Sequence, residues 1–308
     1  MLPFVARRVG FGVLTVFLTA CFAYGAIRVL QPELYGGESV ISGTWHDVDS
    51  AVFHLTLGDP GIKQDWLDGL WADLFLLAGG AIVAVVMGVA GGMWCAARPR
   101  SRASRALEAC AMLFLCTPPY VLALGTLLLF APFFGLVPLP FFFEVHTYAP
   151  PLQNPWDFFR SMLLPWFCVG TPLAAAILRL TLSGTIEGMS EEWVRTARAK
   201  GVRHDRVVRK HAAPSSFATV ASLFGASAPI LVTNMVLVES VFSVPGFFGH
   251  MRRALAQNVG GDDKSINIPM LQALSMWAAV LIVALSLIAD LALMRYDPRI
   301  RTSGKTLG

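Results

Sequence analysis

Charged residues are scarce in this sequence, where Asp, Glu, Lys and Arg make up only 14% of 308 residues. A soluble globular domain carries about a quarter, so the scarcity excludes an ordinary soluble protein. Apolar runs of about twenty residues, the length that crosses a bilayer, recur along the chain. With a mean hydropathy of +0.61, the composition predicts an all-α integral membrane protein with several membrane-spanning helices.

Motifs for covalent chemistry and for cofactors are also missing. The five cysteines form no CxxC pair and fall within or at the ends of apolar runs, and the six histidines show no HExxH spacing. The chain has neither a GxSxG nucleophile elbow nor a GxxxxGK(S/T) phosphate loop. We therefore expect no enzyme activity, no metal and no cofactor in this chain. If ATP drives its function, another chain must bind the ATP.

Six segments are long and apolar enough to span a membrane. Arg7 and Arg8 precede the first of them, and no A-x-A-like cleavage site follows it, so we interpret this segment as a retained helix. The six predicted spans are residues 9–30, 70–97, 107–130, 161–182, 217–244 and 269–294.

The distribution of basic residues predicts the orientation of these spans. Eighteen of the 24 Lys and Arg residues lie on one side, in residues 7–8, 98–105, 179–210 and 295–305. Because cytoplasmic loops keep the excess of basic residues, both termini are predicted to be cytoplasmic. The outer connections are then 31–69, 131–157 and 243–268. The second of these is rich in Pro and Phe, which suits a position at the membrane interface.

A charged loop at residues 187–214, EGMSEEWVRTARAKGVRHDRVVRKHAAP, interrupts the hydrophobic chain. Ser190 is placed to cap a helix that has Glu191 and Glu192 in its first turn, and Gly201 is placed to end it. A second short basic helix over 204–211 precedes Pro214. Such a pair of helices fits the docking of a soluble partner and equally the binding of anionic lipid headgroups. The residues alone leave both functions open.

The amino-acid sequence of this loop resembles that of a known family. EEWVRTARAKGV is similar to the cytoplasmic loop of permease subunits in ATP-binding-cassette importers, above all in the dipeptide, oligopeptide and nickel branch. In that family an E-A-A-x-x-x-G pattern, followed by a proline, forms coupling helices that sit in a groove of the ATPase. Arg195, Thr196, Ala197 and Gly201 stand at the E, A, A and G places. The resemblance implies an ATPase-docking set of Glu192, Arg195, Thr196, Ala197, Lys200 and Gly201.

Further matches follow in the family's order along most of the chain. They are LGDPG at 57–61, PRSRASRALE at 99–108, RLTLSGTIEGMSEEW at 179–193, LVESVFSVPGFFG at 237–249 and DPRIR at 297–301. Three positions depart from the family pattern: Leu182 replaces a frequent arginine, Asp73 a threonine and Thr219 a proline. These departures place in question the geometry where the charged loop meets the fifth span.

The resemblance implies the type I importer permease fold, with residues 1–69 forming the first span and a long outer loop. Residues 70–308 would form a five-helix permease core with a cytoplasmic coupling loop at 183–216. The implied function is ATP-driven import of di- or oligopeptides across the bacterial cytoplasmic membrane, in contact with membrane lipid and without nucleic acid. The implied partners are a second homologous permease, two ATPase subunits that bind ATP, and an extracytoplasmic substrate-binding protein.

Two alternatives lie outside peptide import. A nickel or other small-solute importer of the same family fits the same residues. An ion-coupled secondary transporter fits less well, since it needs ionisable pairs near the bilayer midplane and the acids here cluster towards helix ends; an intramembrane enzyme lacks catalytic pairings. Glu239, in the predicted fifth span, is the candidate for contact with the translocation path, because burial of an ionisable residue in hydrocarbon is costly.

Overall fold

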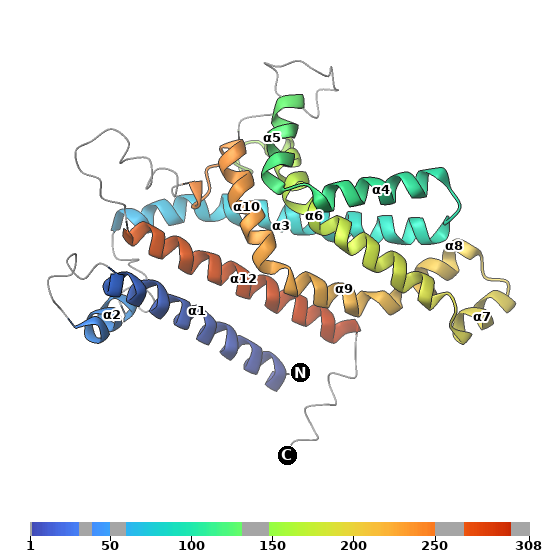
Figure 1. The fold of residues 1–308 in the computed structure, drawn as a ribbon, viewed down its shortest axis with the longest axis horizontal. Coiled ribbons are helices and arrows are strands. Elements are labelled where there is room, and N and C mark those ends of the chain that lie inside the picture. The colour runs from blue at the N-terminus through green and yellow to red at the C-terminus, as the bar shows by residue number, and fades with distance from the viewer. Residues whose placement is uncertain (1, 31–38, 50–59, 131–147, 250–267, 297–308) are drawn as a thin grey trace. The chain divides into compact units, whose positions relative to one another are not determined.

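A computed structural model describes residues 2–30, 39–49, 60–130, 148–249 and 268–296 (Figure 1), and these residues are helical with turns and no β-strand. Residues 131–147 of the loop predicted to lie at the membrane interface are outside the described residues. The DPRIR motif at 297–301 is also outside them. The helices are α1 (Leu2–Leu30), α2 (Val40–Val48), α3 (Pro60–Ala97), α4 (Arg102–Cys116), α5 (Pro119–Phe130), α6 (Pro155–Gly188), α7 (Glu192–Ala199), α8 (His204–Val207), the π-helical turn η4 (Val208–Ala212), α9 (Pro214–Ala226), α10 (Ala228–Phe242) and α12 (Ile268–Tyr296).

Four of the six predicted spans are single long apolar helices, namely α1, α3, α6 and α12. The other two are bent pairs: α4 and α5 meet at 112°, and α9 and α10 meet at 56°. If each bent pair is one span, the described residues contain six. Large apolar side chains on these helices, among them Ile82, Val86 and Leu113, are more than half exposed. Contiguous exposed apolar surface is what a bilayer covers, so the all-α membrane class is confirmed.

The segment predicted as a span over 107–130 is not one straight helix but the bent pair α4 and α5. Pro118 and Pro119 have no N–H, so the carbonyls of Phe114 and Leu115 cannot receive their helical hydrogen bonds. Thr117, immediately before the prolines, takes an extended conformation with ψ 124°. The span predicted over 217–244 is likewise broken, at Ser227.

The chain divides into two compact units, described here one at a time. The first comprises residues 1–74 with 243–287, and the second comprises residues 75–242 with 288–308. The sequence analysis divided the chain into residues 1–69 and 70–308 by the order of its segments, not by their contacts. That division stays a prediction.

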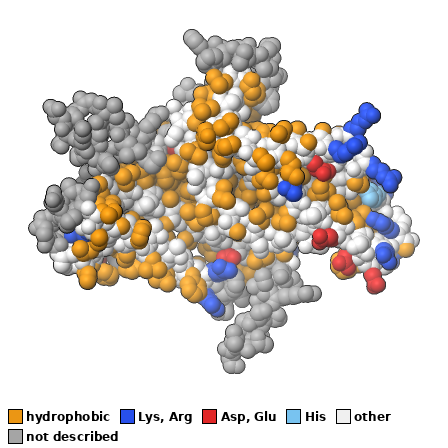
Figure 2. All heavy atoms as spheres, in the orientation of Figure 1, with side chains coloured by type: hydrophobic (Ala, Val, Ile, Leu, Met, Phe, Trp, Pro, Cys, Tyr) orange, Lys and Arg blue, Asp and Glu red, His pale blue; other side chains and the backbone are white. Residues whose placement is uncertain are grey.

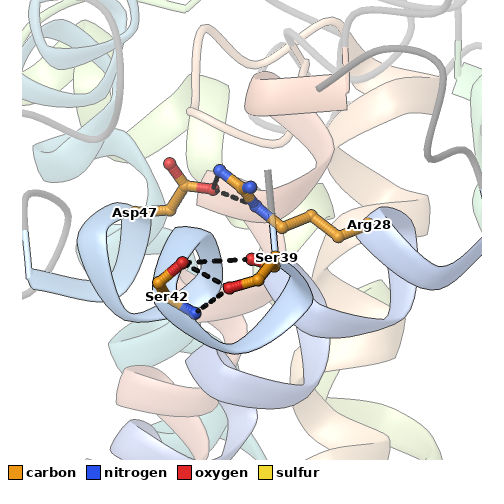
Figure 3. A network of polar contacts seen from close by, with 4 residues as sticks. All are labelled: Arg28, Ser39, Ser42 and Asp47. Carbon is orange, nitrogen blue, oxygen red and sulfur yellow. Dashed lines mark hydrogen bonds and ion pairs between the residues drawn. The ribbon is translucent and has the colours of Figure 1, made fainter. Parts of the chain in front are cut away.

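In the first unit a partly buried ion pair joins α1 to α2 (Figure 3). Nε and Nη2 of Arg28 donate to Oδ2 of Asp47 at 3.0 and 2.9 Å, and Arg28 is only 5% exposed. The guanidinium lies so close to Gly43 that a Cβ there would come within 1.7 Å of Nη1. Ser39 begins α2 by accepting the Ser42 backbone N–H at 3.3 Å. A glycine and a cap thus make room for a charged pair that would otherwise be costly to bury.

Asp73 fastens the start of α3 to two other segments of the first unit. Its side chain is completely buried, and Oδ1 accepts the backbone N–H of Phe247 at 3.1 Å. Oδ2 accepts the indole N–H of Trp277, on α12, at 2.7 Å. One turn earlier, Gly69 lies so close to the Phe247 backbone that a Cβ would approach its nitrogen to 2.3 Å. The departure from the family's threonine therefore gives a carboxylate that holds the VPGFFG segment, part of the 237–249 match, against α3.

In the second unit α6 is the central helix, with α4, α5, α9 and α10 packed around it (Figure 1). The part of α3 in this unit lies against α6 through glycines. A Cβ at Gly88 would come within 2.6 Å of the Ile177 Cβ, and one at Gly92 within 2.6 Å of the Leu178 carbonyl oxygen. The GxxxG spacing of these two residues thus marks a close approach of helices.

Gly92→Ala is expected to lower the stability of the second unit by about 1–3 kcal/mol, because the added methyl must push the α6 backbone away. Gly125→Ala is the matched control, since a Cβ at Gly125 meets no heavy atom of the described chain within 4 Å. Thermal unfolding of the two purified variants in detergent measures the difference. Equal melting temperatures would show that the α3–α6 contact is looser than the structure has it.

Candidate functional site: the charged loop

The charged loop of the second unit folds as two short helices joined by a left-handed glycine. Gly201 has φ +74° and follows the last residue of α7 by two positions. The N–H of Gly201 donates to the Arg198 carbonyl at 2.9 Å, and the N–H of Val202 donates to the Ala197 carbonyl at 3.3 Å. These two bonds form a Schellman motif, which satisfies carbonyls that the end of a helix leaves open. The predicted helix end at Gly201 is confirmed.

The beginning of α7 differs from the prediction. Ser190 does not cap it: its hydroxyl donates to the Glu187 carbonyl at the end of α6, at 2.6 Å. The N-cap position belongs to Glu191, whose side chain makes no capping bond. Ser190 is one residue too early because α6 continues to Gly188 and the turn between the helices is very short. Glu192 still lies in the first turn, where an acid suits the helix dipole.

A small apolar cluster holds the two helices together. Val194 of α7, Val207 of α8 and Ala212 of η4 are fully buried, and Met189 and Val202 pack against them. The Trp193 indole N–H donates to the His211 carbonyl at 3.4 Å, which ties α7 to η4. The loop is therefore a packed structure of its own, rather than two independent surface helices.

The second basic helix runs on into α9 instead of ending before Pro214. Its last turn is π-helical, and the Ala213 N–H donates to the Val208 carbonyl, five residues earlier, at 2.8 Å. Since Pro214 has no N–H, it fits at the first position of α9, where an N–H would have no helical partner. The loop is thus continuous with the fifth span.

The predicted docking residues fall on two sides of this structure. Glu192, Arg195, Thr196, Lys200 and Gly201 are exposed, whereas Ala197 is only 8% exposed and faces the interior of the loop. Figure 2 shows Lys, Arg, Asp and Glu side chains gathered at this end of the second unit, while hydrophobic side chains cover the flanks of its spans. The exposed members thus share one charged surface, and Ala197 supports it from beneath.

Trp193 is a surface residue that the sequence reasoning missed. It is 54% exposed at the start of α7, beside Glu192. A half-exposed tryptophan among charged residues is typical of the anchor positions of protein interfaces. The available signal was an aromatic residue at a solvent-facing position of an otherwise charged helix.

A polar crevice of about 240 Å³ lies beside the loop, between the end of α6 and the start of α9. Glu187, Glu191 and Ser215 line it, together with Thr219, the position at which the family's proline is absent. The Ser215 hydroxyl lies 2.7 Å from the Ala212 carbonyl oxygen and 3.2 Å from that of Gly184, and so links η4 and α6. The α6–α9 junction is therefore held by a serine and close packing.

Glu239 lies in α10 and is only 1% exposed. Its contact with a translocation path stays a prediction. Within the described ranges, no three His, Cys, Asp or Glu side chains come together in a metal-binding arrangement.

Comparison with known proteins agrees with this geometry. The family described as "Binding-protein-dependent transport system inner membrane component" matches residues 88–302, a range that includes the charged loop at 187–214. A Brucella ovis protein named as a peptide permease is 30% identical over 236 residues, covering 75% of this chain and 68% of its own length. The oligopeptide transport system permease protein AppB of Bacillus subtilis is 27% identical, covering 74% of this chain and 68% of its own length.

A third relative matches almost from end to end. The di/tripeptide transport system permease protein DppB of Pseudomonas aeruginosa is 25% identical over 98% of this chain and 99% of its own length. The helices long enough to cross a membrane and the family match over residues 88–302 are thus consistent with one another. This chain belongs to the family of binding-protein-dependent transport system inner membrane components.

Proposed function

We propose that this chain is one of two membrane subunits of an ATP-driven importer of short peptides in the bacterial inner membrane. The relatives named above are described as peptide, oligopeptide and di/tripeptide permeases, and the family is one of binding-protein-dependent transport. In this proposal the chain forms part of the peptide path and performs no covalent chemistry. A second permease completes the path, and a soluble binding protein delivers peptide to the outer side.

The α7–α8 loop is the docking element for the ATPase in this proposal, and the observation that carries it is the loop's architecture. A left-handed glycine and a buried apolar cluster present Glu192, Arg195 and Lys200 on one rigid, exposed surface. A lipid-binding helix needs an exposed apolar face that enters the bilayer. Here the apolar residues Val194, Val207 and Ala212 are instead buried against one another within the loop, which favours a protein partner.

ATP can drive transport only if the ATP-bound ATPase favours one conformation of the permease over the other. A ligand shifts an equilibrium only by the difference between its affinities for the two states. ATP bound by two ATPase subunits would close them, and the loop would move with the ATPase. Because η4 continues into α9 without a break in the backbone helix, this movement would reach the fifth span directly. The loop and both termini are assigned to the cytoplasmic side, as the basic-residue distribution predicts.

The proposal is tested by purifying the tagged chain from its native membrane in mild detergent and identifying the proteins that accompany it. We expect a second permease, ATPase subunits and a substrate-binding protein that carries peptide. A chain that purifies alone and transports without ATP would contradict the proposal. A binding protein loaded with a metal ion or another small solute would retain the importer and overturn the peptide substrate.

Reversing the exposed charges of the loop is expected to weaken the ATPase interaction. The double variant Arg195→Glu with Lys200→Glu leaves the buried cluster intact, since both side chains are exposed. Like-charge contact across an interface costs several kcal/mol, so the amount of co-purified ATPase should fall by roughly tenfold or more. Arg7→Glu with Arg8→Glu is the matched control, because it reverses two exposed basic residues on the same predicted side of the membrane. Equal losses in both variants would show that net charge matters and the loop does not.

A further inference from the structure

A cavity of about 350 Å³ lies in the second unit, beside two breaks between helices and a proline inside a third, continuous helix. Its walls come from the break between α4 and α5 at Thr117–Pro119, from α6 around Pro172, and from the break between α9 and α10 at Ser227. Each interruption is near the middle of its span: α4 and α5 have 15 and 12 residues, and α9 and α10 have 13 and 15. Pro172 is likewise central in α6, residues 155–188. If each bent pair is one span, the cavity therefore lies near the middle of the three spans that border it.

The interruptions leave backbone acceptors without their helical donors. Pro118 and Pro119 cannot donate to the carbonyls of Phe114 and Leu115, and Pro172 cannot donate to that of Cys168. Irregular backbone at membrane depth is tolerated where it is buried in protein or lines a water-filled cavity. Two such breaks and Pro172 of the continuous helix α6 border one cavity, which indicates a polar binding environment in otherwise apolar helices.

Two buried side chains add polar groups to the same cavity. Ser227 and Asn234 both line it and are 8% and 4% exposed. With Ile230 and Leu231 they occupy positions i, i+3, i+4 and i+7 along the start of α10, which places all four on one face. Among the residues that the structure describes, neither the Ser227 hydroxyl nor the Asn234 amide has a hydrogen-bond partner. The polar atoms of these two side chains are not fully enclosed by protein, so the Asn234 amide is open to the cavity and can pair with a ligand or water there.

The uncharged lining and the volume of the cavity indicate which kind of ligand fits it. The residues that line it are apolar, hydroxyl or amide, and none is charged, so a charged group would be poorly solvated there. Its volume is near the lower end of ligand sites and suits a short stretch of extended chain. An asparagine amide offers one acceptor and two donors, which complements the C=O and N–H groups of a peptide bond.

We propose that this cavity binds the uncharged backbone of the transported peptide, with Asn234 as the residue that pairs with a peptide amide. The inference rests on the proposed function and adds to it a place for the substrate. Since the pairing reads only the backbone, the site accepts peptides of varied side chain. The charged ends of the peptide stay outside the cavity.

Cys116 provides a direct measurement, because its exposed thiol lines the cavity while the exposed Cys110, on the same helix, does not. Two versions of the chain, each retaining one of these cysteines and carrying Ala at the other four, are assembled with the full transporter and labelled with a small maleimide. A transported peptide, supplied with the binding protein and ATP, should slow labelling of Cys116 several-fold and leave Cys110 unchanged. Equal labelling of Cys116 with and without peptide would overturn the site.

Asn234→Leu tests the pairing itself, with Thr233→Val, an exposed neighbour on α10, as the matched control. The native transporter should prefer a peptide over an analogue in which an ester replaces one amide, because the ester lacks the N–H. In Asn234→Leu peptide uptake should fall about tenfold, the loss of one buried hydrogen bond, and the preference should disappear. If the Asn234→Leu variant still prefers the peptide over the ester analogue, the proposed binding site is wrong, while the proposed import function stands. A native transporter that imports no peptide overturns the proposed function, and this inference with it.

Discussion

Gly201→Pro is expected to abolish ATP-driven uptake while the spans still fold and insert. Proline holds φ near −65°, whereas Gly201 has φ +74°. Proline also removes the N–H that donates to the Arg198 carbonyl. The Schellman turn would open, Val202 would leave the cluster of Val194, Val207 and Ala212, and α7 would lose its fixed angle to α8. Uptake and ATP hydrolysis by the reconstituted transporter measure the effect, and we expect hydrolysis that is no longer stimulated by substrate.

The control for this variant is Gly201→Asn. Asparagine enters the left-handed region more easily than other non-glycine residues, and a Cβ at this position meets no described heavy atom within 4 Å. Asn should therefore retain most of the uptake, and Gly201→Ala should fall between the two, since a left-handed alanine costs roughly 1–2 kcal/mol. Native uptake by the proline variant would show that the turn is not needed for coupling.

Asp73→Leu is expected to destabilise the first unit by roughly 2–5 kcal/mol. The carboxylate is fully buried, and its removal leaves the Phe247 backbone N–H and the Trp277 indole N–H without this acceptor. Each buried donor left unsatisfied costs about 1–3 kcal/mol. Asp73→Asn should cost less, because the amide oxygen can still accept one of the two bonds while its NH₂ group faces the other donor.

Asp68→Asn serves as the comparison, since Asp68 is exposed on the same helix. Thermal unfolding in detergent should show a clearly lower melting temperature for Asp73→Leu and no change for Asp68→Asn. Quenching of Trp277 fluorescence provides a local readout of the lost contact. An unchanged melting temperature in Asp73→Leu would mean that the VPGFFG segment is held against α3 by packing alone.

Hydrophobicity and charge predict the large features of this fold well. The bilayer requires long apolar segments whatever their packing, so the membrane class and four unbroken spans follow from the sequence alone. Gly201 was also predictable, because few residues other than glycine enter the left-handed conformation that ends a helix. The loop's two helices follow from the same local rules.

The remaining features depend on contacts that composition does not reveal. The Pro118–Pro119 break lies within an apolar run, and hydrophobicity alone does not register a missing N–H. The helix α3 begins at Pro60 rather than at the predicted span start of 70, because a helix can extend beyond its apolar core through polar residues such as Lys63 and Asp68. Because α6 continues to Gly188, the Ser190 hydroxyl bonds the end of α6 and does not cap α7 as predicted. Asn234, a single amide in an apolar helix, gains significance only from the cavity that it lines.

Cross-linking from the loop tests the central proposal most directly. A cysteine introduced at Lys200, which is exposed beside Gly201, is placed in a chain without its native cysteines, and a short bifunctional reagent is applied to the assembled transporter in native membranes. We expect a cross-link to the ATPase subunit whose yield changes when ATP is bound, and no such product from a cysteine at the exposed Leu152 on the predicted outer side. Products with lipid only, or with no ATPase in any nucleotide state, would contradict the proposal.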